Sequence, residues 1–146
     1  MLMFMKEVKR KYLKMSNKIY VGWNEIEELV DDLCYHISCN HPNIKYVHGL
    51  KRGGLIPAVM ISHTLGLEYV DTPHFYHDEC LIVDDICDSG VTLEKWNETH
   101  ITAVLHYKSH TACVEPTIHA FTHKGDEWII YPWERDDSET IQDYLK

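Results

Sequence analysis

The run from Leu81 to Thr92 constrains the fold more than any other part of this 146-residue chain. Its first three residues are apolar, as in a buried strand, and they lead directly into two acids, Asp84 and Asp85. A polar, glycine-containing loop comes next, and residues 92–98 can begin a short helix. A buried strand that passes through a polar loop into a helix is typical of α/β folds with a parallel sheet.

Apolar periodicity elsewhere predicts further strands and helices in alternation. We expect a helix over residues 24–37, with Asn24 as its N-cap and Glu27 completing a capping box. A second helix over residues 55–65 should stop at Gly66, and a terminal helix should follow Ser138. Strands are predicted at residues 44–50, 67–71, 80–83, 100–107, 117–121 and 128–131. This order predicts an α/β class with a mostly parallel, doubly wound sheet flanked by helices, and sites at the carboxyl ends of the strands.

Charge and cysteine content narrow the possible partners. The formal net charge is -9, which argues against nucleic acid or an anionic membrane as the main partner. No apolar run is long enough for a membrane span, and five irregularly spaced cysteines without a CxxC pair suggest reduced thiols in the cytoplasm. An acidic protein that binds an anionic substrate needs local cations, loop amides or a metal ion.

The N-terminus differs in charge from the rest of the chain. Residues 1–14 contain five Lys or Arg residues and one Glu, after a short apolar start. They could form an extra helix, a partner-binding tail or an extension upstream of the domain. We favour the extension and divide the chain into a basic segment, 1–14, and a single domain, 15–146.

The loop Asp88-Ser89-Gly90-Val91-Thr92 has the composition of a phosphate cradle, since its amides and hydroxyls precede a helix N-terminus. The two preceding acids can hold ribose hydroxyls directly or through Mg²⁺. Acidic turns are also common as helix caps, so D-S-G alone is weak evidence. The complete run is far more specific, and it resembles the phosphoribosyl pyrophosphate signature of the type I phosphoribosyltransferases.

Three other segments extend this resemblance toward the xanthine-guanine and hypoxanthine enzymes of bacteria and archaea. Lys51-Arg52-Gly53-Gly54 would be an ordinary basic turn by itself, but here it resembles the pyrophosphate loop, which in relatives contains a non-proline cis peptide. Trp128 begins a segment similar to the base-binding segment, in which the aromatic ring stacks on the purine and the backbone of Ile129 reads its edge. Lys108 follows a strand where relatives place a lysine that donates to the 6-oxo oxygen, although a lone lysine there is otherwise a solvated loop residue.

The resemblance covers about residues 15–134 and implies a purine salvage enzyme that transfers the phosphoribosyl group to guanine, xanthine or hypoxanthine. It makes Asp84, Asp85 and Asp88 catalytic, with Asp85 the Mg²⁺ contact and Asp88 the general base or acid at the purine N7. It places phosphoribosyl pyrophosphate on both loops, and the purine on Asp88, Lys108, Trp128 and Ile129. By analogy we also expect a homodimer or homotetramer.

The chain departs from these relatives in one connection. Only residues 72–80 join two strands where relatives carry a long flexible loop, so we expect a reduced hood and either slow turnover, hydrolysis of the sugar pyrophosphate or a lid from a neighbouring subunit. The shortened loop leaves open a catalytically weak or inactive regulatory protein with the same fold. The spacing of His74, His77 and Cys80 also admits a zinc site, which lacks an apparent fourth ligand.

Overall fold

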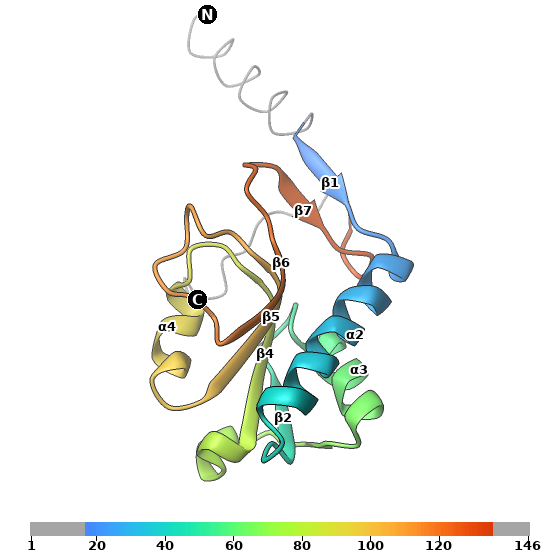
Figure 1. The fold of residues 1–146 in the computed structure, drawn as a ribbon. Coiled ribbons are helices and arrows are strands. Elements are labelled where there is room, and N and C mark those ends of the chain that lie inside the picture. Colours follow the sequence, from blue (N-terminus) through green and yellow to red (C-terminus); the bar gives the residue numbers. More distant parts are fainter. Residues whose placement is uncertain (1–16, 136–146) are drawn as a thin grey trace, which may run out of the picture.

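A computed structural model describes residues 17–135, which form two parallel sheets and three α-helices (Figure 1). The larger sheet has the strand order β3-β2-β4-β5-β6 and all its strand pairs are parallel. Its strands are β2 (Tyr46–Gly49), β3 (Glu68–Tyr69), β4 (Cys80–Cys87), β5 (Ile101–Tyr107) and β6 (Ile118–Thr122). The α/β class and the parallel sheet are therefore as the sequence predicts.

Helices cover both faces of this sheet. The helices α2 (Trp23–Asn40) and α3 (Leu55–Leu65) lie on one face, and α4 (Val91–Asn97) lies on the other (Figure 1). Each face has its own apolar core. Ile26, Leu33 and Ile61 of α2 and α3 pack on the first face, and Leu93 of α4 packs on the second.

A second, two-stranded sheet stands apart from the first. It pairs β1 (Lys18–Tyr20) with β7 (Trp128–Ile130), in a register that sets Ile19 opposite Ile129. The sequence predicts β7 as a strand but not β1, and it does not predict that β7 leaves the main sheet.

Two local predictions are wrong. The helix predicted to be capped at Asn24 begins at Trp23, with Gly22 as N-cap and no side-chain cap, so Asn24 lies inside the first turn. The chain enters α2 directly from the small sheet, where the Val21 amide donates to the Ile130 carbonyl at 2.9 Å, and this pairing sets where the helix starts. The strand predicted to end at residue 83 continues to Cys87, because its second half pairs with β5.

The predicted helix over residues 55–65 has those bounds, and Gly66 ends it at φ 66°, a left-handed conformation that glycine adopts without cost. Residues 72–80 form two short 3₁₀ turns, Pro73–Phe75 and His77–Glu79, so the connection is as short as expected. No helix within residues 17–135 is long and apolar enough to cross a bilayer. The basic segment 1–14 and the helix predicted after Ser138 lie outside the described residues.

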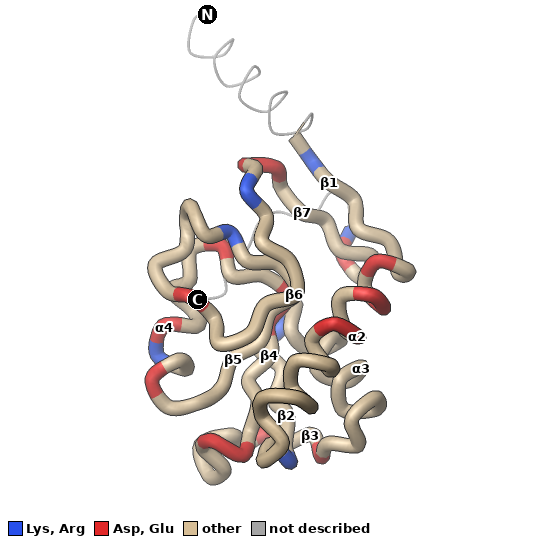
Figure 2. The backbone as a smooth tube through the Cα atoms, in the orientation of Figure 1, with Lys and Arg blue, Asp and Glu red and all other residues tan. Residues whose placement is uncertain are grey.

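Acidic positions recur along α2 and near the ends of several strands, while basic positions are fewer and separated (Figure 2). Any strongly anionic ligand therefore depends on local donors, of which Lys51 and Arg52 are an exposed adjacent pair.

Candidate active site

The two loops predicted to bind phosphate follow β2 and β4, which are parallel neighbours in the large sheet. The Leu50 amide donates to the Val83 carbonyl at 2.9 Å, which joins the start of the Lys51–Gly54 loop to the strand that carries the acids. A Cβ built on Gly54 would lie 2.2 Å from the same carbonyl. Glycine is required there because the two backbones approach too closely for a side chain. The Lys51–Arg52 peptide bond is cis, as the resemblance implies.

Gly53 brings the loop into contact with Asp85. A Cβ on Gly53 would lie 2.0 Å from Asp85 Oδ2, so the carboxylate occupies the space that any larger residue would need. The basic loop thus packs directly against Asp85. The sequence predicts this proximity only through the resemblance.

The acid pair lies on β4 and not in the loop after it. The Asp85 amide donates to Asp84 Oδ1 at 2.9 Å, and Asp85 Oδ1 accepts from the Ile86 amide at 2.8 Å. Burial raises the pKa of Asp85 to about 6, with a further contribution from the negative charge of Glu134, while the bonds to Asp84 and Ile86 oppose the shift. The protein alone therefore does not fully balance the negative charge of the Asp85 carboxylate.

The loop from Asp88 to Thr92 leads from β4 into α4. Gly90 has φ 81°, and a Cβ there would lie 3.0 Å from the Cys113 amide nitrogen, so both conformation and space favour glycine. The Ser89 carbonyl accepts from the Cys113 amide at 2.8 Å, which holds the loop against the segment after β5. Ser89 Oγ accepts from the Val91 amide at 3.4 Å, and Val91 begins α4.

Two of the predicted base-site residues, Asp88 and Lys108, come together. Lys108 is only 5% exposed, and its Nζ lies 3.9 Å from Asp88 Oδ2. The same Nζ donates to the carbonyl of Glu127 at 2.8 Å, and Glu127 directly precedes Trp128. Lys108 is thus not a solvated loop residue, since it joins Asp88 to the start of β7.

Thr111 is a site residue that sequence reasoning missed. Its hydroxyl lies 2.9 Å from both Asp88 Oδ1 and the Asp88 carbonyl, and its single proton can be donated to either. One oxygen of the Asp88 carboxylate therefore contacts Thr111 while the other faces Lys108. Nothing in the local sequence indicates this contact, because the two residues are 23 positions apart.

Trp128 and Ile129 differ in which of their groups a ligand could contact. The Trp128 amide donates to the Asn17 carbonyl at 2.7 Å, and the Ile130 carbonyl accepts from Val21, so these groups face β1. Backbone groups alternate between the two edges of a strand, which directs those of Ile129 away from β1. The Ile129 side chain is buried in the core, so only its backbone is free to read a ligand. Within residues 17–135 the Trp128 indole contacts no other ring.

The zinc arrangement does not form in the described part of the chain. The His74 ring stacks on Trp96 at 4.9 Å, the His77 ring stacks on His100 at 5.6 Å, and the Cys80 side chain is buried. No group of three or more His, Cys, Asp or Glu residues within 17–135 is arranged to hold a metal ion.

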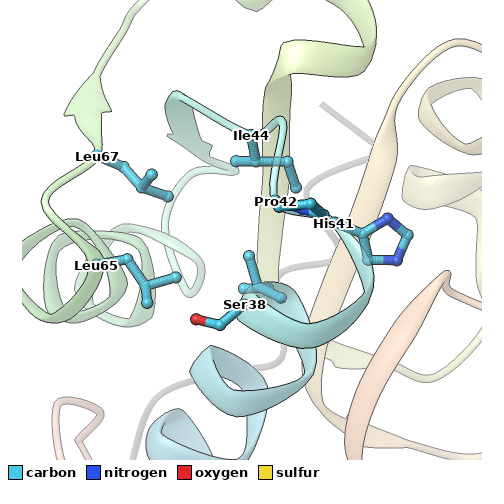
Figure 3. A pocket seen from close by; sticks show the side chains of 7 residues that line it. Ser38, His41, Pro42, Ile44, Leu65 and Leu67 are labelled. Carbon is cyan, nitrogen blue, oxygen red and sulfur yellow. The ribbon is translucent and has the colours of Figure 1, made fainter.

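A pocket of about 250 Å³ with mixed polar and apolar walls lies elsewhere, near the amino ends of β2 and β3 (Figure 3). It opens between the C-terminal ends of α2 and α3 and is lined by Ile37, Ser38, His41, Pro42, Ile44, Leu65 and Leu67. None of these residues belongs to the predicted site.

The chain is similar in sequence to known phosphoribosyltransferases. The chain is 27% identical to a xanthine-guanine phosphoribosyltransferase of Vibrio vulnificus, over 82% of this chain and 91% of that protein. A relative of the same name from Cereibacter sphaeroides is 26% identical, over 79% and 86%. No family model matches the chain.

Two solved structures with the same fold carry the names of purine phosphoribosyltransferases. A purine phosphoribosyltransferase from Pyrococcus horikoshii superposes with a TM-score of 0.69 and 25% identity, over 86% of this chain and 99% of that one. The Helicobacter pylori xanthine-guanine-hypoxanthine phosphoribosyltransferase gives 0.68 and 19%, over 82% and 95%. The chain is therefore a homologue of the bacterial xanthine-guanine phosphoribosyltransferases and has the type I phosphoribosyltransferase fold.

Proposed function

We propose that this chain is a purine salvage enzyme that transfers the 5-phosphoribosyl group of phosphoribosyl pyrophosphate to a 6-oxopurine. The products are the nucleoside monophosphate and pyrophosphate. The observation that carries the proposal is the convergence of Asp88 and Lys108 with the start of β7, beside the loop Ser89–Thr92. A protein that only bound the sugar phosphate would need no buried lysine facing a carboxylate at the base end of the site.

The reaction is a displacement at C1 of the ribose. A purine ring nitrogen forms the new bond to C1 while the bond to pyrophosphate breaks, through a state with positive charge on the sugar. Lys51, Arg52 and the amides of their loop receive the leaving pyrophosphate, and Ser89 to Thr92 hold the 5'-phosphate. Holding both reactants in line supplies most of the rate enhancement, so the protein needs no covalent step.

Asp88 and Lys108 have distinct roles toward the base. Asp88 accepts the N7 proton of the purine or returns it, and Thr111 keeps the carboxylate oriented. Lys108 donates to the 6-oxo oxygen once a base replaces its contact with Glu127. An adenine amino group would leave this buried donor without a partner, which is the physical basis for rejecting adenine. Trp128 would stack on the ring and contribute affinity without selectivity.

We further propose that Mg²⁺ binds with the substrate, held by Asp85 with Asp84 beside it. The donor chemistry fits, because Mg²⁺ prefers oxygen ligands and usually shares them with substrate phosphates. Burial raises the pKa of Asp85, and the charge of Glu134 adds to the shift, so a nearby cation would stabilise the charged carboxylate. The ion would neutralise charge on pyrophosphate as it leaves.

The short connection over residues 72–80 affects how efficiently the phosphoribosyl group would reach the base rather than water. Without a long closing loop, water has readier access to C1, and we expect measurable hydrolysis of phosphoribosyl pyrophosphate beside transfer to the base. A lid from a neighbouring subunit would reduce this loss, and by analogy we propose a cytoplasmic homodimer or homotetramer. The alternative of a weak or inactive regulatory protein gains no support from the arrangement of Asp88, Lys108 and Thr111.

The test is product formation with the full chain, phosphoribosyl pyrophosphate, Mg²⁺ and each of guanine, xanthine, hypoxanthine and adenine. We expect nucleotide from 6-oxopurines, none from Asp88→Asn, and a relative gain for adenine in Lys108→Ala. Asp78→Asn and Lys45→Ala are matched controls at exposed positions at the other end of the sheet. Tight binding of phosphoribosyl pyrophosphate without nucleotide from any base would instead establish the regulatory alternative.

A further inference from the structure

The base-binding strand β7 belongs to the small sheet, whereas the acids that face the ribose lie on β4 of the large sheet. Transfer needs the base and C1 of the ribose in line, so the two sheets must be held in a fixed position relative to each other. Tyr131, the residue after β7, connects them. Its side chain is only 2% exposed, and its ring contacts the rings of His106 and Trp133.

The Tyr131 hydroxyl has two partners on the large sheet. It lies 3.1 Å from the backbone carbonyl of Asp85 on β4 and 2.8 Å from Nδ1 of His106 on β5. A carbonyl oxygen can only accept, so the single hydroxyl proton goes to Asp85. The contact with His106 is satisfied when Nδ1 carries a proton and donates to the hydroxyl oxygen. One chain of hydrogen bonds thus runs from His106 through Tyr131 to Asp85.

Neither His106 nor Tyr131 changes its protonation state near neutral pH, so the hydrogen bonds that join them to Asp85 persist there. Burial lowers the pKa of His106 to about 4, helped by His123 and Lys108, so the imidazole is neutral and has one N–H. Burial also raises the pKa of Tyr131 well above its usual value, and the hydroxyl keeps its proton. Near neutral pH both hydrogen bonds therefore keep these directions.

The backbone of Tyr131 adds a second connection to the acid pair. Its amide donates to Glu134 Oε1 at 3.0 Å, and the Glu134 charge acts on Asp85. The Tyr131 ring lies parallel to that of Trp133 at 4.9 Å, and Trp133 contacts Trp23 at the start of α2 at 6.0 Å. The residue is held on both sides, so a shift of Tyr131 would move β7 relative to β4.

We propose that Tyr131 is a positioning residue of the transfer reaction. Its hydroxyl, which His106 orients, holds the base-binding strand at a fixed position relative to Asp85. The inference rests on the proposed function and adds to it a determinant that touches neither substrate. Its consequence is specific: losing the hydroxyl displaces the base relative to C1 but leaves both phosphate loops in place.

The experiment measures how each variant divides phosphoribosyl pyrophosphate between nucleotide, formed when the base attacks C1, and ribose 5-phosphate, formed when water attacks. For Tyr131→Phe we expect kcat for nucleotide to fall about tenfold or more, since a displacement approaching 1 Å can cost about 100-fold. The KM for phosphoribosyl pyrophosphate should stay the same, and the share of nucleotide should fall. A merely structural role would lower the folded fraction and leave that share unchanged.

Three further variants serve as controls. His106→Leu removes the donor and should behave as Tyr131→Phe does, whereas His106→Asn places an amide N–H near Nδ1 and should restore the share of nucleotide. Tyr46→Phe removes a tyrosine hydroxyl at the start of β2, away from the site, and should match the wild type. If Tyr131→Phe does not fold, the two His106 variants decide the question.

An unchanged share in Tyr131→Phe, or equal losses in His106→Leu and His106→Asn, would overturn the positioning role while the transferase function stands. If the wild type formed no nucleotide at all, both proposals would fail together.

Discussion

Replacing Gly53 with Ala tests the contact between the pyrophosphate loop and the acid pair. The new Cβ would lie 2.0 Å from Asp85 Oδ2, 2.4 Å from Cγ and 2.8 Å from Oδ1. All three distances are shorter than real Cβ contacts, and relieving the closest one requires a movement of about 1 Å. The carboxylate is not free to rotate away without loss, because Oδ1 accepts from the Ile86 amide.

Either the loop or Asp85 must therefore move, and both would bind phosphoribosyl pyrophosphate in the proposed site. A misplacement of about 1 Å can cost about 100-fold in rate, so we expect kcat/KM for phosphoribosyl pyrophosphate to fall by about that factor. Overpacking should also cost about 1–3 kcal/mol in the free energy of unfolding. The measurements are initial rates at saturating guanine, calorimetric binding of phosphoribosyl pyrophosphate and urea denaturation.

Gly22→Ala is the matched control. No atom beyond its chain neighbours lies within 4 Å of a Cβ built there, and its φ of -90° suits any residue, so activity should stay near the wild type. Because alanine is a poorer N-cap than glycine, the free energy of unfolding should fall by about 1 kcal/mol at most. Wild-type kcat/KM in Gly53→Ala would refute the reasoning, because it would mean that the closeness of Gly53 and Asp85 has no part in substrate binding.

Three other predictions follow from the site and its surroundings. The pKa of Asp85 is raised from 3.8 to about 6, so its charged form opposes folding at higher pH. Asp85→Asn should therefore abolish transfer but raise the free energy of unfolding at pH 8. After allowing for partial exposure, we expect a gain of about 1–2 kcal/mol. That gain should disappear as the pH falls through 6 toward 4, and a gain independent of pH would contradict the assignment. Thr111→Val should lower kcat about tenfold while Thr111→Ser retains activity, and equal rates would show that the hydroxyl does not orient Asp88. Among the described cysteines, iodoacetamide at pH 8 should label the exposed Cys39 and Cys113 in the folded protein, as mass spectrometry can establish. The buried thiols should stay unlabelled, because burial raises their pKa values to about 11 or 12, and labelling of any of them would contradict the prediction. These thiols are Cys34, Cys80 and Cys87.

Local signals predicted much of the fold because they act within a few residues. The helix over residues 55–65 has its predicted bounds, since its start after a Gly-Gly pair and its stop at Gly66 depend on backbone preferences. The capping box at Asn24 failed because a strand pairing between Val21 and Ile130 sets the start of that helix. The predicted end of β4 failed for a similar reason, because pairing with β5 outweighs the polar character of Asp84 and Asp85.

The sequence by itself determined the order of the strands and helices after β1, the two glycine-containing loops and the residue types that suit a purine phosphoribosyl site. Those features are local, or they occur as contiguous motifs. Tertiary structure alone decided that Thr111 contacts Asp88 across 23 residues, and that Tyr131 contacts Asp85 across 46. It also decided that β7 leaves the main sheet to pair with β1. Hydrogen bonds between residues so far apart depend on how the sheets pack, and packing leaves no mark in the neighbouring sequence of either partner.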